Sequence, residues 1–252
     1  MTWRHIPFQS FDAFTNMAID EAIMEAVREG RSPPTIRLYG WSPSAVSIGF
    51  FQGLRNEVDV GACQEAGVTV VRRITGGGAV YHDKEGEVTY SLIAPEGMFP
   101  KNIIESYRGI CQPIIDALAD FGIAAAFQPI NDIIVGEGLN ARKISGNAQT
   151  RRGGILLQHG TILWDVDVDR MFSLLKVSDE KMRDKLVHSV KKRVTCVKEY
   201  YTASQAELSR SLSKAFAAAF PGEERDYSAE EHARANTLAR QKYGAADWNG
   251  QR

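Results

Sequence analysis

The sequence predicts a domain of the α/β or α+β class, with a mixed β-sheet flanked by helices. Two observations predict this class. Segments with the alternation of half-buried strands dominate the first two thirds of the 252 residues, and segments with helical periodicity fill the last third. The length suits one domain with a single large core. We therefore expect residues 1–252 to form a single domain with a helical C-terminal segment at about 203–252.

The first half of the chain is expected to contain one long helix followed by strands. Residues 16–27 carry apolar side chains at helical spacing and precede Gly30 and Pro33, which are typical of a helix end. Strands are then expected at 35–39, 45–51, 68–73 and 87–94, with a short helix at 58–66. Gly49, inside the second of these strands, indicates a bulge or the close approach of another backbone.

The second half is expected to begin with the longest amphipathic helix, at residues 102–121. Gly122 is its candidate C-cap, and Pro113 predicts a kink or a break inside it. Strands are expected next, at 133–135, 143–148 and 154–163. The remaining segments with helical periodicity are 168–175, 179–187, 204–220 and 229–243.

The composition excludes several classes of protein. The formal net charge is −1, so the chain has no basic excess with which to bind nucleic acid or an anionic membrane. No apolar run is long enough to cross a bilayer, and the N-terminus lacks the pattern of a signal peptide. Cys63, Cys111 and Cys196 are far apart, which supports neither a zinc site nor a disulfide framework. We expect a cytoplasmic enzyme.

The strongest local pattern is R-R-I-T-G-G-G-A-V-Y-H-D at residues 72–83. Three consecutive glycines after a strand allow a sharp turn and bring backbone N–H groups close to a ligand. Together with Arg72 and Arg73 they predict a cradle for an anion. The pattern matches neither a dinucleotide-binding fingerprint nor a P-loop. From the residues alone, a glycine turn beside two solvated arginines is an equal alternative.

A second pattern combines Asn131-Asp132 with R-K-I-S-G-N-A at residues 142–148. Lys143 alternates with apolar residues, so its ammonium group is a candidate to hold a phosphate or to stabilise a developing negative charge. Asp132 is a candidate ligand for Mg²⁺, which typically takes only one or two carboxylates. The structural alternative is an edge-strand lysine beside an Asn-Asp turn.

The third pattern is Gln158-His159-Gly160-Thr161, inside a mostly apolar strand. Gly160 indicates that another group approaches the backbone at this point. A buried histidine is more often structural than catalytic, so we assign no acid–base role to His159. Cys196 is a candidate nucleophile, but a structural role is favoured for it and for the other two cysteines.

In this order along the chain, the three patterns resemble the lipoate–protein ligase A family. The resemblance extends from the N-M-A-I-D-E-A segment at residue 16 to Trp248-Asn249. This family is part of a superfamily of lipoyl and octanoyl transferases that shares its core fold with biotin–protein ligases. The resemblance therefore implies a biotin/lipoate–protein ligase-like catalytic domain.

The resemblance also implies a site. Lys143 would be the catalytic residue and would reach both the acyl carbonyl and the α-phosphate of an adenylate. Asn131 and Asp132 would lie near the phosphate, with Asp132 on Mg²⁺, while His159 and Gly160 would lie beside the adenylate. Arg73 would contact the nucleotide. The acyl chain and the phosphate would be wrapped by a loop of seven residues, namely Gly76, Gly77, Gly78, Ala79, Val80, Tyr81 and His82.

The activity implied is that of a lipoate–protein ligase. Such an enzyme activates lipoic acid with ATP and Mg²⁺ to lipoyl-AMP, then transfers the lipoyl group to a lysine of an acceptor. The expected acceptors are apo lipoyl domains of 2-oxoacid dehydrogenases and the glycine-cleavage H protein. The chain ends at Arg252, without the C-terminal accessory domain of longer ligases. We therefore expect a separate small accessory subunit to support the activation step.

Three alternatives stay open. An octanoyltransferase would take octanoate from octanoyl-acyl carrier protein through a cysteine thioester, and residues 3–39 and 193–196 resemble such enzymes. We favour the ligase because residues 127–133 contain no cysteine where these transferases carry one, and contain Asn131-Asp132 instead. A non-catalytic module that binds lipoate or lipoyl-AMP is the second alternative. A biotin ligase, the third, would be expected to carry a loop rich in glycine and arginine.

Overall fold

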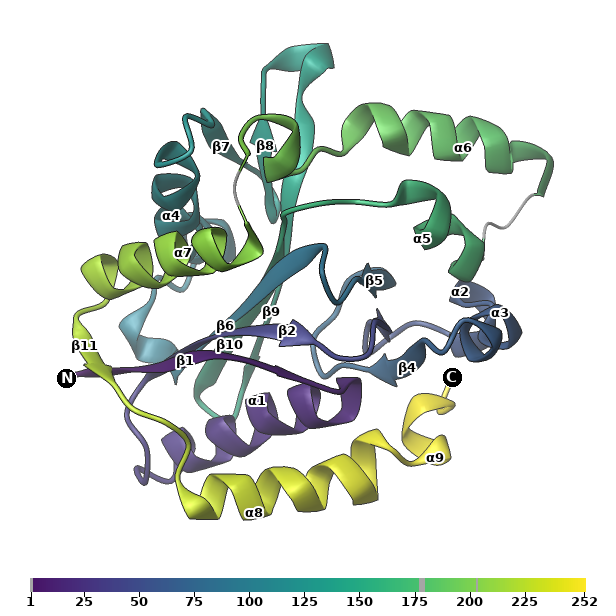
Figure 1. Ribbon diagram of the computed structural model, residues 1–252. Coiled ribbons are helices and arrows are strands. Elements are labelled where there is room, and N and C mark those ends of the chain that lie inside the picture. The colour runs from purple at the N-terminus through teal and green to yellow at the C-terminus, as the bar shows by residue number, and fades with distance from the viewer. Residues whose placement is uncertain (1, 177–179, 203) are drawn as a thin grey trace.

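The computed structural model describes residues 2–176, 180–202 and 204–252, and for 180–186 the backbone alone (Figure 1). Its centre is an eight-stranded sheet in the order β11-β1-β2-β6-β10-β9-β8-β7. β1 runs parallel to β2 and β11, and the other neighbours are antiparallel, which confirms the predicted mixed sheet. The strands are β1 (Trp3–Phe11), β2 (Thr35–Trp41), β6 (Glu87–Pro95), β7 (Ala125–Gln128), β8 (Asp132–Val135), β9 (Arg142–Arg152), β10 (Ile155–Leu163) and β11 (Gly222–Glu224).

A second, three-stranded sheet stands beside the first. Its middle strand β3 (Ala45–Ile48) pairs in parallel with β4 (Thr69–Arg72) and antiparallel with β5 (Val80–His82). The short helices α2 (Leu54–Glu57) and α3 (Val60–Glu65) belong to this part of the chain. Its small core contains Val46, Ile48 and Cys63.

Helices cover both faces of the large sheet (Figure 1). On one face α4 (Ile103–Ala119) packs against α7 (Gln205–Ala219), and on the other α1 (Ala13–Arg28) packs against α8 (Ala229–Leu238). Because strand side chains alternate between faces, Leu156 of β10 enters the core under α4, while Leu157 enters the core under α1. The same alternation places His159 on the α1 face of the sheet.

The remaining elements of the described residues are three helices and four turns. They are α5 (Val168–Leu174), α6 (Glu180–Arg193), α9 (Ala246–Asn249), the 3₁₀ turns η1 (Glu96–Met98), η2 (Gly138–Asn140) and η3 (Val197–Glu199), and the π-helical turn η4 (Ala239–Tyr243). Within the ranges that the structure describes, no helix has the length and apolar character needed to span a bilayer.

Most of the predicted elements are present, and two of the expectations about them need correction. Pro113 predicted a kink or a break, and the break is absent, because α4 continues through Pro113. Ile110 and Ile114 are fully buried on either side of the proline, and their packing offsets the loss of one helical hydrogen bond. The predicted helical segment at 203–252 contains α7, α8 and α9, but the short strand β11 lies between the first two and joins the sheet. Residue 179, the first of the predicted helix at 179–187, and residue 203, the first of the predicted C-terminal segment, lie outside the described ranges.

Candidate active site

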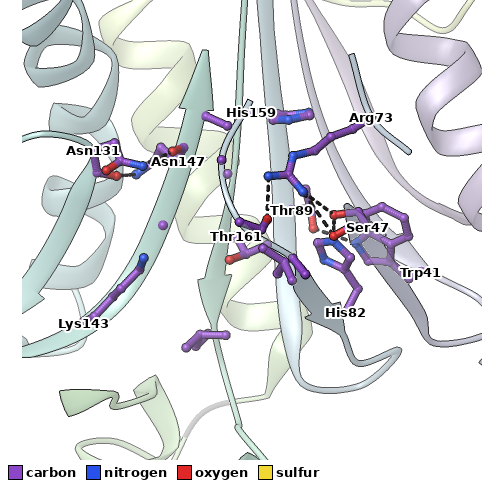
Figure 2. Close-up of a pocket in the computed structure, with 18 of the residues that line it drawn as sticks. Trp41, Ser47, Arg73, His82, Thr89, Asn131, Lys143, Asn147, His159 and Thr161 are labelled. Atoms are coloured by element: carbon purple, nitrogen blue, oxygen red, sulfur yellow. Dashed lines mark hydrogen bonds between the residues drawn. The ribbon is translucent and has the colours of Figure 1, made fainter. Parts of the chain in front are cut away.

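A cavity of about 310 Å³ lies on the α1 face of the large sheet, where the small sheet approaches it. Figure 2 shows Lys143 on one wall, with Trp41, Ser47 and His82 across the cavity. The cavity brings together most of the predicted site residues, namely Arg73, Gly77, Gly78, Ala79, Val80, His82, Asn131, Lys143, His159 and Gly160. Of the others, Tyr81 packs in the small-sheet core, and Asp132 lines a neighbouring cavity.

Arg73 holds the glycine loop in shape. Its Nη2 donates to the carbonyl oxygens of Gly76 and Gly78, each at 2.8 Å, and its Nε donates to Thr75 Oγ1 at 3.1 Å. Burial lowers the pKa of Arg73 to about 10. All of these acceptors are neutral, so the guanidinium places an unneutralised positive charge behind the loop. Such a fixed charge attracts an anion or a carbonyl oxygen that becomes negative during a reaction.

The loop also depends on a close contact between two glycines. Gly77 has a φ of +96°, a conformation that residues with a side chain rarely adopt. A Cβ at Gly49 of the chain after β3 would collide with the carbonyl of Gly77. The prediction that another backbone approaches Gly49 is therefore confirmed.

Lys143 and Asp132 meet across two neighbouring strands. Lys143 Nζ lies 2.7 Å from Asp132 Oδ1, and the two side chains are 41% and 32% exposed. β8 and β9 change register at this point, beside Ile133 and Ile134. The backbone of Lys143 is fixed by Thr195, whose N–H donates to the Lys143 carbonyl at 2.9 Å. A Mg²⁺ ion on Asp132 would therefore share this carboxylate with the ammonium group of Lys143.

Asn131 fixes β9 through two hydrogen bonds with Asn147. Its side-chain amide donates to the carbonyl of Asn147, while its own carbonyl accepts from Asn147 Nδ2 at 2.9 Å. Asn147 lines the cavity and also accepts a hydrogen bond from Tyr90 at 2.8 Å. A Cβ at Gly160 would collide with Asn147 Oδ1, which confirms that Gly160 admits a close neighbour.

His159 connects the glycine loop to α1. Its Nε2 lies 2.7 Å from Thr75 Oγ1, and its Nδ1 lies 3.4 Å from Asp20 Oδ2. Burial lowers the pKa of His159, which favours the neutral imidazole. Burial opposes ionisation of Asp20 as well, but the charge of Arg37 and the hydrogen bond with His159 overcome it and lower the pKa of this carboxyl. This geometry suits a structural role for the histidine.

His82 is held between three neighbours at the far wall. Its Nε2 lies 2.8 Å from Ser47 Oγ, and its Nδ1 lies 2.7 Å from Glu87 Oε1. The Trp41 ring stacks on the imidazole at 3.9 Å between centroids. Trp41 and Ser47 were not among the residues expected in the site. Ser47 carries a weak signal, since it stands two residues before Gly49, whereas nothing in the sequence around Trp41 singles it out.

None of the three cysteines is in the lining of this cavity. Cys63 belongs to the small-sheet core, and burial raises its pKa to about 11. Cys111 is a buried residue of α4, on the opposite face of the large sheet, and burial raises its pKa to about 12. Burial also raises the pKa of Cys196, and the nearby charges of Glu199 and Asp165 add to this effect. Burial therefore favours the neutral form of each thiol.

A second cavity, of about 630 Å³, lies on the other side of Lys143. It shares Lys143 and Val194 with the first cavity. Its lining includes the polar or charged residues Gln128, Asp132 and Arg193. Lys143 therefore stands where two cavities meet.

Residues 12–217 match the family model of the lipoyl protein ligase A/B catalytic domain. The chain is 37% identical to octanoyltransferase LipM of Geobacillus kaustophilus, over 99% of this chain and 98% of that protein. It is 34% identical to octanoyltransferase LipM of Brevibacillus brevis, over 98% of each. It is also similar to a bipartite lipoate protein ligase from Thermoplasma acidophilum, studied with its E2 lipoyl domain (TM-score 0.89, 30% identity, 99% of this chain and 96% of that one).

These relatives correct the predicted activity. The prediction of an ATP-dependent lipoate–protein ligase is wrong, because curated proteins similar to this chain over 82–99% of its length are octanoyltransferases. Residues 127–133 favoured a ligase, whereas the segments at 3–39 and 193–196, which resemble transferases, agree with these relatives. The use of ATP, Mg²⁺ and lipoic acid, and the accessory subunit, stay predictions. The chain belongs to the family of the lipoyl protein ligase A/B catalytic domain and is an enzyme of the lipoate ligase and octanoyltransferase group.

Proposed function

We propose that this enzyme transfers an octanoyl group from octanoyl-acyl carrier protein to a lysine of a lipoyl domain. The observation that carries the proposal is the position of Lys143. Its ammonium group stands at a cavity whose walls include Met17, Val80 and Leu163. An acyl chain bound there has apolar surroundings, and its carbonyl is within reach of a fixed positive charge.

The apolar walls account for binding of the chain. Each methylene group that leaves water contributes roughly 0.8 kcal/mol, so an eight-carbon chain gains several kcal/mol from burial. The glycine loop, held by Arg73, lines the cavity, and its contact with a bound acyl chain would limit the access of water and protect an activated acyl group from hydrolysis.

Lys143 accounts for the chemistry. When an amine attacks the acyl carbonyl, the oxygen becomes negative, and a preorganised cation stabilises that charge without rearrangement. Asp132 holds the ammonium group in position through the contact at 2.7 Å. The proposed acceptors are lipoyl domains of 2-oxoacid dehydrogenases and the glycine-cleavage H protein, in keeping with the lipoyl domain paired with the Thermoplasma relative.

The choice of acyl donor tests this proposal. The purified chain is incubated with an apo lipoyl domain and, in separate reactions, octanoyl-acyl carrier protein, or lipoic acid with ATP and Mg²⁺. We expect the mass of the acceptor to increase by one octanoyl group with the carrier protein as donor. A mass increase only in the reaction with lipoic acid and ATP would contradict the proposal.

A further inference from the structure

We infer that Trp248 and Asn249 are positioning residues, which act through Arg72 to hold the glycine loop in the shape that the acyl cavity requires. The inference rests on the proposed function, because it takes this cavity to be the site of the acyl chain. None of these three residues is in the lining of either cavity. An effect of theirs on the acyl chain must therefore pass through other residues.

Trp248 and Asn249 cover the free edge of the small sheet at Arg72. β4 is an edge strand of that sheet, and its outer side has no neighbouring strand among the described residues, so its polar backbone groups there need other partners. Helix α9 packs on β4 at this edge (Figure 1). Asn249 Oδ1 accepts from the Arg72 N–H at 2.7 Å, and Trp248 Nε1 donates to the Arg72 carbonyl at 2.9 Å. Two side chains of α9 therefore replace a neighbouring strand at Arg72.

The side chain of Arg72 joins α9 to the turn at residues 49–52. The guanidinium group is fully buried and donates to five backbone carbonyls. Two of these are the carbonyls of Trp248 and Asn249, at 3.1 and 2.8 Å. The other three belong to the turn, namely those of Gly49, Phe50 and Gln52, at 3.1, 3.1 and 2.6 Å. All five partners are neutral, which gives Arg72 a structural role in place of the predicted one in an anion cradle.

The turn at residues 49–52 is in direct contact with the glycine loop. The N–H of Phe50 donates to the carbonyl of Thr75 at 2.9 Å, one residue before the first glycine of the loop. Gly49 lies so close to the carbonyl of Gly77 that a Cβ has no room between them. Gly77 itself lines the acyl cavity. A displacement of the turn therefore displaces the wall of the cavity.

The C-terminal segment is itself fixed to α1. Asn249 Nδ2 donates to the carbonyl of Tyr243 at 2.6 Å, and the Tyr243 hydroxyl donates to Glu21 of α1 at 2.6 Å. The ammonium group of Lys242 lies 2.7 Å from the Glu21 carboxylate and 4.2 Å from the centroid of the Trp248 ring, within the range of a cation–π contact. Trp248 and Asn249 therefore have a support of their own, from which they can hold Arg72 and the turn.

Asn249→Ala and Trp248→Phe test the inference, since each removes one partner of the Arg72 backbone and leaves the cavity lining unchanged. With octanoyl-acyl carrier protein and an apo lipoyl domain, we expect KM for the donor to rise roughly three- to tenfold, the range of one hydrogen bond, and kcat to stay within about twofold. The value of kcat is preserved because Lys143 and Asp132 belong to β9 and β8, which Arg72 does not hold. Asp247→Ala, at an exposed residue of α9, is the matched control and should change neither value.

Amide hydrogen exchange, followed by mass spectrometry, separates positioning from a loss of global stability and needs no turnover. We expect both variants to exchange faster than wild type in peptides that cover residues 47–53, and at the wild-type rate in peptides from α4. Faster exchange throughout the chain, or a fall in kcat with KM unchanged, would show a destabilised protein and overturn the inference. Wild-type exchange and wild-type KM in both variants would overturn it as well. A wild-type chain that transfers no octanoyl group would overturn the proposed function, whereas the exchange data would still decide whether Trp248 and Asn249 hold the turn.

Discussion

Gly49 is a residue at which one missing side chain decides the shape of the site. The chain after β3 passes so close to Gly77 that a Cβ at position 49 would collide with its carbonyl. That carbonyl belongs to the loop that Arg73 holds through Gly76 and Gly78. Glycine is therefore required at position 49 because of the loop that lines the acyl cavity, and not because of the strand.

We predict that Gly49→Ala lowers the free energy of unfolding by about 1–3 kcal/mol, the usual cost of an added group in a closely packed place. It should also weaken binding of octanoate by about tenfold or more, because the loop is displaced. Urea denaturation and calorimetric titration measure the two effects. Gly97→Ala is the control, since a Cβ there meets nothing within 4 Å and its φ is not positive. Equal behaviour of the two variants would contradict this account of the loop.

At the scale of the elements, a buried ion pair joins β1 to α8. Arg4 donates from Nη1 and Nη2 to the two carboxylate oxygens of Glu231, each at 2.7 Å, and both side chains are 2% exposed. Ser32 and the N–H of Ser228 donate to the same carboxylate at 2.8 Å. The pair fixes α8 against the sheet, and α8 in turn packs on α1, whose Met17 lines the cavity.

This pair makes stability depend on pH. Burial opposes ionisation of Glu231, but the hydrogen bonds and charge of Arg4 overcome it and lower its pKa from 4.5 to about 2. A carboxyl whose pKa is lower in the folded state stabilises the protein above its unfolded pKa, and this contribution is lost as the pH falls from about 5 to 2.

We therefore predict that Glu231→Gln lowers the free energy of unfolding at pH 7 by about 2–4 kcal/mol, since it leaves Arg4 buried without a counter-charge. The loss of stability of the variant between pH 5 and pH 2 should be shallower than that of the wild type. Denaturant titrations across this range measure both effects. Glu230→Gln, at an exposed neighbour that pairs with Arg31 on the surface, should change neither. If the free energy of unfolding of both variants changed with pH in the same way, the Arg4–Glu231 pair would not be the source of the pH dependence.

At the scale of the whole molecule, the site lies where the two sheets meet, and this explains what the sequence could predict. Long periodic segments such as 16–27 and 102–121 were predicted because one face of each helix is apolar. β1 was not predicted because Arg4 and His5 are buried within it, so its pattern lacks the alternation of a strand. β5 and β11 have three residues each and exist through pairing with distant strands.

Prediction of the site is limited in the same way, because part of it depends on contacts between distant segments. The glycine loop, Lys143 and His159 carry local patterns, and the structure gathers them in one cavity. Trp41, by contrast, reaches the cavity only because β2 lies beside β6, where its Nε1 donates to Thr89. Contacts of this kind depend on the order of strands in the sheet, which single-sequence patterns do not contain.

The octanoyl-transfer rate of a Lys143→Ala variant decides whether Lys143 is the catalytic residue. Octanoyl-acyl carrier protein and an apo lipoyl domain are the substrates, and the variant is compared with Lys191→Ala. Lys191 is also an exposed lysine in contact with an aspartate, since its Nζ lies 2.6 Å from Asp169 Oδ2. Loss of a preorganised cation at a developing oxyanion costs on the order of 10²–10³ in rate, which is the decrease that we predict for Lys143→Ala. Lys191→Ala should transfer octanoate at the wild-type rate. Equal rates for Lys143→Ala and the wild type would contradict the assignment of Lys143 as the catalytic residue.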